Sequence, residues 1–361
     1  MTSCCQLHRD KSVATSPRPR SLRVLHVIPG EPQTSEMIFA RRESAGLKQV
    51  GIDSQIFYLR SRISPLRIWN EAIRFHRMIR SLEPDLIHAQ FGTMTAFFSV
   101  FLTSKPVVVT FRGTDLNSDP SQSWLRSFFG RTLSRLAAAR AAATVCVSEQ
   151  LRRRLWWNRS RAVVLPGSVD LEQFKPRSRV QTRAELGWDD HARVVLFNLG
   201  RFPKVKRPDM AAAAVKLAAE QVGPIRLHVL DGSIDPGKIP NLLNAADCLL
   251  ITSVCEGSPT ILREALACNL PVVSVDVGDV RERLRGVSDS YVVGNDTAQL
   301  ANALAAVLRT RARSNGRDAV QHLAVARFNH ELSAVYRAAL RQRSKAAAAL
   351  LAASEHRRAR V

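Results

Sequence analysis

Two acidic residues, Glu256 and Glu264, lie eight positions apart in the second half of the chain and are candidates for chemistry. A carboxylate repels a phosphate, so acids beside an anion site need another role, and accepting hydrogen bonds from hydroxyl groups is one. Sugars supply such hydroxyls. Glu264 could accept from both hydroxyls of a ribose, and Glu256 from those of a second sugar. Each acid taken alone could equally be a solvated charge.

The elements around the two acids are predicted to be a strand, a helix and a second strand. Cys248 to Ile251 is a short apolar run typical of a buried parallel strand. Ser258 is predicted to cap a helix that starts at Pro259 and ends at Asn269, which tolerates the left-handed conformation. The second strand is Val272 to Val275. The start of such a helix points free amides at the carboxyl edge of the sheet, which suits a diphosphate.

A basic loop precedes this unit. Arg193 to Leu199 is predicted to be a strand, and Arg201 and Lys206 follow Gly200 with a spacing of five positions. An arginine and a lysine in one loop could clamp a diphosphate. The alternatives are a solvated basic loop, or a register in which Lys204 takes the place of Lys206.

The stretch from Glu256 to Cys268, with Pro271-Val272-Val273 and Gly278 to Glu282 after it, resembles the nucleotide-sugar signature of retaining GT-B glycosyltransferases of family 4. The resemblance covers residues 22 to 340 and is strongest from 196 to 284. It implies an α/β fold of two Rossmann-like, doubly wound domains that face each other across a cleft. The second domain would then bind the nucleotide sugar, and the first domain the acceptor.

The resemblance also implies roles for individual residues. Arg201 and Lys206 would hold the leaving diphosphate, Glu256 would contact the transferred sugar, and Glu264 would bind the ribose. The donor phosphates would lie against backbone at the helix start and after the first strand, at Gly257, Ser258, Thr260 and Gly30.

Two positions depart from the family pattern. Gln90 and Arg112 stand where the family usually has histidine, each at the carboxyl end of a predicted strand. The second departure matters more, because that histidine contacts the donor sugar in the family. Arg112 is therefore predicted either to pair with phosphate as a catalytic residue or to mark a changed activity.

The composition predicts a globular chain with an anionic partner. The chain has 361 residues and is 45% hydrophobic, enough for two domains with cores. Its formal net charge of +22 favours membrane lipid, a phosphorylated substrate or nucleic acid as partner.

The six cysteines have no metal-ligand or disulfide spacing, which favours a reducing cytoplasm. The sequence contains no Asp-x-Asp, so we expect no metal and no cofactor apart from the donor substrate.

The chain is expected to divide into four parts. We expect no transmembrane span, and the polar, basic stretch from Met1 to Ser21 lacks the apolar core of a signal peptide or membrane anchor. The parts are a disordered basic N-terminus (1–21), an acceptor domain (22–175), a nucleotide-sugar domain (176–325), and a crossover helix with a basic tail (326–361).

Two basic segments allow a second role. Pro65 to Arg80 is an amphipathic helix with Leu66, Trp69, Ile73 and Met78 among arginines. It could lie on an anionic membrane, but the simpler interpretation is that these side chains pack on the sheet. Arginines and tryptophans also alternate from 152 to 161, a pattern seen in nucleic-acid binding as well as in solvated basic faces.

These observations predict a metal-independent glycosyltransferase. It would move a hexosyl or N-acetylhexosaminyl group from a UDP- or GDP-sugar, with retention, to a saccharide or lipid-linked acceptor. The setting would be polysaccharide or glycolipid biosynthesis in the cytoplasm, with the inner face of the membrane as one option. The alternatives are a sugar-nucleotide epimerase or hydrolase on the same fold, and a non-catalytic binder of nucleic acid or anionic membrane.

Overall fold

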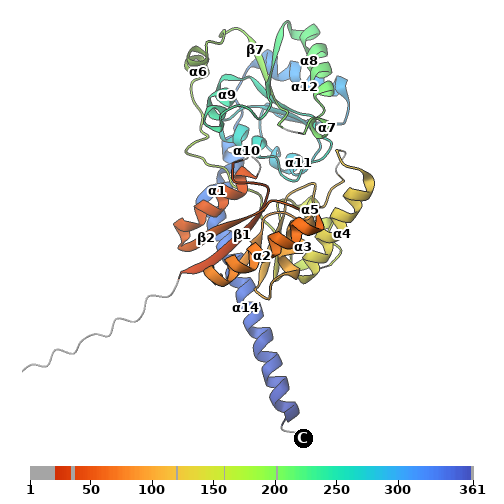
Figure 1. Cartoon of the computed structure of the whole chain (residues 1–361). Coiled ribbons are helices and arrows are strands. Elements are labelled where there is room, and N and C mark those ends of the chain that lie inside the picture. The colour runs from red at the N-terminus through yellow and green to blue at the C-terminus, as the bar shows by residue number, and fades with distance from the viewer. Residues whose placement is uncertain (1–20, 34–36, 119–120, 158, 201, 359–361) are drawn as a thin grey trace, which may run out of the picture.

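The structure is a computed structural model that describes residues 21–33, 37–118, 121–157, 159–200 and 202–358. The predictions for the N-terminus and for Arg201 lie outside these ranges. Figure 1 shows two α/β domains, one above the other, with the long helix α14 (Val325–Arg358) running from the upper domain down past the lower one.

The first domain is built on a parallel sheet in the order β2-β1-β3-β4-β5-β6. Its inner strands are largely buried because helices cover both faces, whereas the edge strand β2 alternates buried and exposed positions. The strands are β1 (Leu22–Pro29), β2 (Ile52–Leu59), β3 (Leu86–Ala89), β4 (Val107–Phe111), β5 (Ala143–Cys146) and β6 (Val163–Val164).

Helices on one face of this sheet share a core with it around Phe57, Phe98 and Val109. They are α2 (Pro65–Leu82), α3 (Thr93–Phe101), α4 (Trp124–Arg140) and α5 (Glu149–Arg153). The opposite face carries α1 (Ile38–Gly46), the 3-10 helix η1 (Leu47–Val50) and the first turns of α14. Phe328, Leu332 and Tyr336 of α14 are buried there, so the last long helix of the chain packs on the first domain.

The second domain is built on a parallel sheet in the order β11-β10-β9-β7-β8. Its strands are β7 (Arg193–Asn198), β8 (Ile225–Leu230), β9 (Cys248–Ile251), β10 (Val272–Val275) and β11 (Tyr291–Val293). Its longer helices are α6 (Arg179–Leu186), α8 (Pro208–Val222), α9 (Ile239–Ala245), α10 (Thr260–Ala267) and α12 (Thr297–Thr310). The prediction of two Rossmann-like, doubly wound domains is confirmed; the domain boundaries stay a prediction.

The carboxyl edges of the two sheets face each other. All strand pairs in the described part of the chain are parallel, so the loops that follow the strands gather at one edge of each sheet. Gly113 follows β4 of the first sheet, and a methyl group added to its Cα would lie 3.1 Å from the amide nitrogen of Gly257, which follows β9 of the second. The two loop layers are therefore in contact at this point.

The packing predicted for α2 is wrong for three of the four apolar side chains. Leu66, Trp69 and Ile73 are exposed, and only Met78 packs against the core. The sheet is covered instead by a second apolar stripe on the helix, which includes Phe75 and Ile79. An 18-residue helix has room for two stripes, and the one centred on the fully buried Phe75 is the one that packs.

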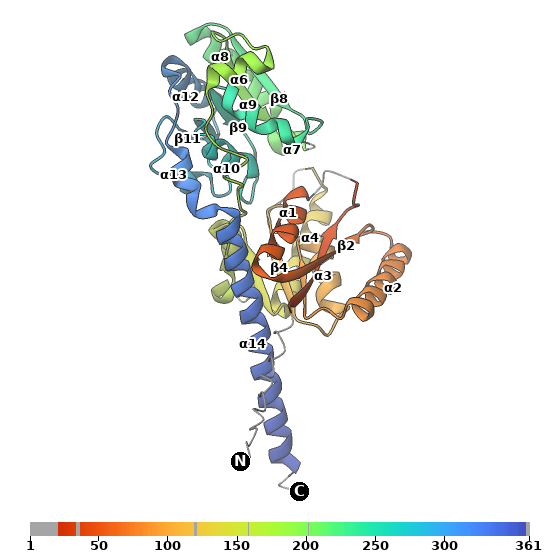
Figure 2. The same ribbon diagram turned by 90° about the vertical axis from the view of Figure 1, so that its left-hand side faces the viewer.

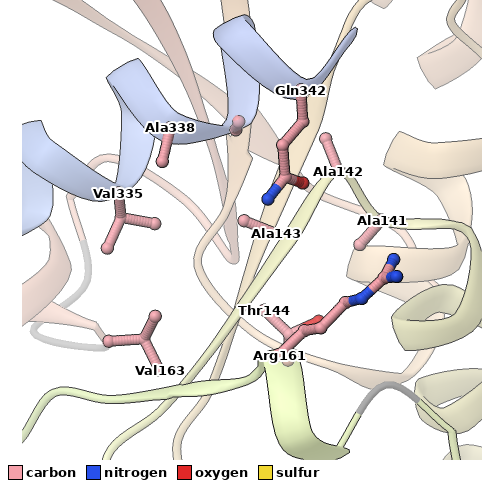
Figure 3. A pocket seen from close by; sticks show the side chains of 10 residues that line it. Ala141, Ala142, Ala143, Thr144, Arg161, Val163, Val335, Ala338 and Gln342 are labelled. Carbon is pink, nitrogen blue, oxygen red and sulfur yellow. The ribbon is translucent and has the colours of Figure 1, made fainter. Parts of the chain in front are cut away.

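Figure 2 shows α14 passing beside the first domain and projecting beyond it. A groove of about 120 Å³ lies between this helix and the start of β5, lined by Ala141 to Ala143, Val335 and Ala338 among others (Figure 3). Most of these side chains are small and apolar, and Arg161 is the one charged residue among those that line the groove. The groove is a packing gap at the sheet edge opposite the cleft, and the chemistry must lie elsewhere.

None of the helices that the structure describes is long and apolar enough to span a bilayer.

Candidate functional site

Lys206 and Glu256 meet at the carboxyl edge of the second sheet. They are 50 positions apart in sequence, but β7 and β9 are neighbours, so the loops that follow these strands lie side by side. The short helix α7 (Pro203–Lys206) is tied to the end of β9, because Val254 donates its N–H to Val205 O at 2.9 Å and Thr252 Oγ1 donates to Lys206 O at 2.6 Å. The Lys206 ammonium consequently forms an ion pair with the Glu256 carboxylate, and both side chains are mostly buried.

The start of α10 differs from the prediction. The helix begins at Thr260, Pro259 is the N-cap residue, and the Ser258 hydroxyl does not cap it. That hydroxyl instead donates to Asp279 Oδ2 at 2.8 Å and accepts from the Arg263 guanidinium at 2.7 Å. Two charged partners hold the serine away from the helix amides. The first turn therefore lacks a side-chain cap, which suits an anion site.

Arg263 organises this helix start and was missed by the sequence analysis. It is buried, and its guanidinium donates to Ser258 O at 3.0 Å and to Thr260 Oγ1 at 3.2 Å. A methyl group on Gly167, in the segment that leads to the second domain, would lie 2.7 Å from the same guanidinium. Burial lowers the pKa of Arg263, and the carboxylate of Asp279 opposes that shift. Arg263 thus fixes the loop before α10 by contacts that a local sequence pattern does not predict.

Glu264 and Thr260 line a cavity of about 210 Å³ between the domains. The second domain also contributes Asn198, from the end of β7, and the first domain contributes Phe39 and Arg42 of α1. Burial raises the pKa of Glu264 to about 7, and the positive charges of Arg263 and Arg42 partly oppose the shift. This pKa lies near neutral pH, so a ligand that donates hydrogen bonds to the carboxyl would favour its ionised form.

Gly257 lies where the two domains approach closely. A methyl group at this position would lie 1.8 Å from the carbonyl oxygen of Arg112. Asn117 Nδ2 donates to the Glu256 carbonyl at 3.0 Å, so the contact continues beside it. The glycine allows the loop after β4 and the loop after β9 to touch. This contact accounts for a glycine at position 257 without a role in ligand binding.

A methyl group at Gly257 is expected to push the domains apart. Gly257→Ala should cost about 1–3 kcal/mol in the closed arrangement, because neither neighbouring backbone can yield by itself. Gly237→Ala is a matched control, since a methyl there would meet nothing closer than 3.5 Å. Small-angle scattering and donor affinity would measure the effect; equal values for both variants would contradict the assignment.

The structure uses Arg112 within the first domain. Its guanidinium forms an ion pair with Glu43 Oε2 of α1 at 2.5 Å, donates to Gln90 O at 2.9 Å, and contacts the Gln90 side-chain oxygen. It also lies over the Phe39 ring, 4.6 Å from the centroid. The arginine is therefore bound by acceptors of its own domain, and its direct role in catalysis stays a prediction.

A chain of buried polar groups continues from Gln90 to α14. The Gln90 amide nitrogen lies 2.9 Å from His26 Nδ1, and His88 bridges Tyr336 OH at 2.6 Å and Thr110 Oγ1 at 2.7 Å. Burial, reinforced by the charge of Arg112, lowers the pKa of His26 to about 3. Burial likewise lowers the pKa of His88. Both histidines are neutral near pH 7 and serve as hydrogen-bonding groups.

The structure thus brings most of the predicted site residues to one region. Lys206, Glu256, Gly257, Ser258, Thr260 and Glu264 lie around the end of β9 and the start of α10. Arg112 meets this region through its carbonyl oxygen. Gly30 follows β1 at the carboxyl edge of the first sheet with φ of 106°, a conformation that favours glycine, and its ligand role stays a prediction.

The described residues hold no group of three histidine, cysteine, aspartate or glutamate side chains placed to bind a metal ion.

Both halves of the chain match sequence models of glycosyltransferase families. Residues 32–173 match the sequence model of the family described as Glycosyltransferase Family 4, and residues 229–310 match the one described as Glycosyl transferases group 1. D-inositol 3-phosphate glycosyltransferase of Segniliparus rotundus is 33% identical over 216 residues, covering 49% of this chain and 47% of that protein. The protein of the same description from Mycolicibacterium vanbaalenii is 32% identical over 208 residues, covering 48% and 46%. The chain thus spans about half the length of these relatives.

Solved structures share the fold. Sucrose-phosphate synthase from Thermosynechococcus elongatus superposes with a TM-score of 0.72 at 18% identity, covering 88% of this chain and 98% of that one. The Anabaena protein HepE, solved in complex with UDP-glucose, superposes with a TM-score of 0.68 at 16% identity, covering 88% and 99%. At these identities the similarity shows the fold alone.

Proposed function

Because the chain belongs to the GT-B glycosyltransferases of family 4, we propose that it moves a sugar from a nucleotide-sugar donor to a saccharide or lipid-linked acceptor. In this proposal the transfer retains the anomeric configuration, and the sugar is a hexosyl or N-acetylhexosaminyl group. The reaction serves polysaccharide or glycolipid assembly at the inner face of the membrane.

The observation that carries the proposal is the joining of two features at one edge of the second sheet. The first is the cavity lined by Glu264 and Thr260, whose carboxyl and hydroxyl can recognise a ribose beside an uncapped helix start. The second is the Lys206–Glu256 ion pair on the adjoining loops. A diphosphate over the helix start can draw the Lys206 ammonium to itself, which leaves the Glu256 carboxylate to accept from sugar hydroxyls.

The chemistry we propose is electrostatic. Breaking the bond between the sugar carbon and the diphosphate leaves negative charge on the phosphate oxygen, and fixed positive groups lower the energy of that charge. Lys206 and the amides at the start of α10 supply them, together with Arg201, which we include from the sequence. In this proposal basic side chains take the part that a divalent cation plays elsewhere, so chelators should leave the rate unchanged.

Donor affinity should depend on pH through Glu264. The carboxyl has a pKa of about 7, and its ionised form accepts hydrogen bonds from the ribose hydroxyls more strongly than its protonated form. Below that pKa, binding must first remove a proton, so affinity for UDP-glucose should fall by up to about tenfold per pH unit. Above it, affinity should level off. UDP-glucose is the probe of choice because neither of its phosphates takes up a second proton near neutrality.

Calorimetry from about pH 8 to about pH 6 tests this dependence. Glu264→Gln should bind more weakly at high pH and show a nearly flat profile. Glu282→Gln, a change of the same kind at an exposed acid, should keep the profile of the parent chain. An unchanged profile in Glu264→Gln would remove this residue from the ribose site.

The reaction type requires a separate measurement. Incubation with donor alone distinguishes a transferase from the epimerase and hydrolase alternatives, because those two reactions need no acceptor. We expect negligible turnover until a saccharide or polyprenyl-phosphate-linked acceptor is added. Rapid conversion of the nucleotide sugar in the absence of acceptor would overturn the proposal.

A further inference from the structure

Large apolar side chains cover a surface of the first domain where the fold does not need them. In α2, Leu66 and Trp69 are 73% and 68% exposed. Helix α4 has an inverted pattern: its buried positions are Ser127, Ser134, Ala137 and Ala138, while Trp124, Leu125, Phe128 and Phe129 are exposed. Single exposed apolar residues are ordinary, but several on consecutive turns indicate a contact surface.

Helix α4 also contacts the Trp156-Trp157 pair. The Arg135 guanidinium of α4 lies over the Trp156 ring, 3.8 Å from the centroid, and its Nε donates to Arg154 O at 3.4 Å. Trp156 and Trp157 are themselves more than half exposed and lie edge to face. Hereafter the aromatic surface means Leu66, Trp69, Trp124, Leu125, Phe128, Phe129, Trp156 and Trp157.

Positive charge surrounds the aromatic surface. The sequence from Trp124 to Arg140 contains Arg126, Arg131, Arg135 and Arg140 and no acidic residue. The one acid of α2, Glu71, is buried and bonded to Arg74. Burial, reinforced by the like charges of Arg131 and Arg154, lowers the pKa of Arg135. The surface therefore favours an anionic partner.

The location of the aromatic surface relates it to the cleft. Helices α2, α3, α4 and α5 cover the same face of the first sheet, and they lie in a row in Figure 1. Each long helix of the row follows the carboxyl end of a strand, so its first turns lie at the edge that faces the second domain. Leu66, Trp69, Trp124 and Phe128 belong to those first turns. The apolar side chains thus gather toward the mouth of the cleft.

We propose that the aromatic surface docks the first domain on an anionic lipid bilayer, with the tryptophan and phenylalanine rings in the interfacial region and the arginines on lipid phosphates. Rings and aliphatic chains enter the boundary between head groups and acyl chains, while nearby cations bind anionic lipid. This inference deepens the proposed function and rests on it in one respect: the bilayer would present a lipid-linked acceptor at the mouth of the cleft.

The composition of the surface favours a bilayer over other anionic partners. Nucleic acid can stack on aromatic rings, but it gains little from Leu66 and Leu125, which are about as exposed as the rings. A second copy of the chain would bring the same cluster of arginines against itself, and the like charges would repel. Only a bilayer combines a broad apolar phase with a layer of fixed phosphates.

The test uses the full chain and vesicles of phosphatidylcholine with or without phosphatidylglycerol, in a flotation assay. The parent chain should bind the anionic vesicles, and lipid brominated on the acyl chain should quench its tryptophan fluorescence. Trp124→Ser combined with Phe128→Ser should weaken vesicle binding by about tenfold or more. Arg126→Glu should weaken it by about fivefold, and more at low salt.

Matched controls lie on the second domain. Val180→Ser combined with Leu217→Ser removes two exposed apolar side chains, and Lys216→Glu reverses one exposed charge. Both controls should bind vesicles like the parent chain. UDP-glucose binding should be unchanged in all these variants, which separates a failure of docking from a failure of the proposed donor site.

Three outcomes would overturn the proposal. The first is a parent chain that does not float with anionic vesicles. The second is equal vesicle binding by the parent chain and the Trp124/Phe128 variant. The third is binding of single-stranded RNA that is lost in that variant while vesicle binding persists, which would assign the aromatic surface to nucleic acid.

Discussion

Replacing Lys206 by alanine is expected to lower kcat for sugar transfer by about 10²- to 10³-fold, the range seen when one preorganised stabilising group is removed from a transition state. Lys206 ends the short helix α7, and hydrogen bonds tie this segment to the residues that follow β9, so its position is fixed before the reaction begins. Before the donor binds, the Glu256 carboxylate already forms an ion pair with the Lys206 ammonium. Its interaction with the diphosphate should therefore grow as charge develops on the leaving oxygen, and the loss should appear in kcat more than in KM.

The ion pair provides a sharper form of this experiment. If Lys206 acts only by holding Glu256, then Lys206→Ala, Glu256→Gln and the double variant should lose the same activity. If the two side chains act on different parts of the donor, the double variant should be worse than either single one. Lys204→Ala is the control, because Lys204 is exposed on the same short helix. A Lys206→Ala variant with kcat within about threefold of the parent would contradict the assignment.

The parallel strands were predictable because they are buried on both faces. The runs Cys248 to Ile251 and Val272 to Val275 are apolar except for Ser274, and the structure assigns β9 and β10 the same bounds. Asn269 adopts the left-handed conformation at φ of 54°, as its position after the helix predicted. In these segments the local preference and the tertiary environment agree, so a single sequence is sufficient.

The neighbourhood of Lys206 and Glu256 was predictable from topology. Both follow strands of one parallel sheet, and the loops after such strands share an edge. The helix cap was not predictable in this way. Ser258 is a residue type that caps helices, but Pro259 is the N-cap residue, and Arg263 and Asp279 bind the Ser258 hydroxyl. Such binding depends on where a distant loop and a buried guanidinium lie, which no local pattern contains.

The contribution of the first domain was the hardest part to predict. Arg42 and Phe39 line the cavity beside Glu264 from a helix whose sequence has no motif. Helix α4 escaped notice because its large apolar residues point outward, so its hydrophobic pattern does not describe its packing. Gln90 and Arg112 were visible as departures from a family pattern. The structural role of Arg112 depends on its ion pair with Glu43, which lies 69 positions earlier in the chain.

Removing Glu43 should be more harmful than removing the whole ion pair. The carboxylate and the Arg112 guanidinium are 4% and 9% exposed, so a single substitution leaves a buried charge without its partner. Glu43→Leu is expected to destabilise the first domain by about 3–5 kcal/mol, whereas Glu43→Leu combined with Arg112→Met should recover much of that loss. Hydrogen exchange of the β3 and β4 amides, read by mass spectrometry, would measure the first domain separately from the second.

The same pair links stability to donor binding. Glu43 anchors α1, and α1 also carries Phe39 and Arg42, which line the cavity opposite Glu264. Glu43→Leu should therefore weaken UDP-glucose binding, and the double variant should restore it, because packing rather than charge would then hold the helix. Glu331→Gln breaks an exposed ion pair with Arg327 and should change stability by less than about 1 kcal/mol. A double variant that folds well but does not bind donor would show instead that Arg112 itself contacts the substrate, the role first predicted for it.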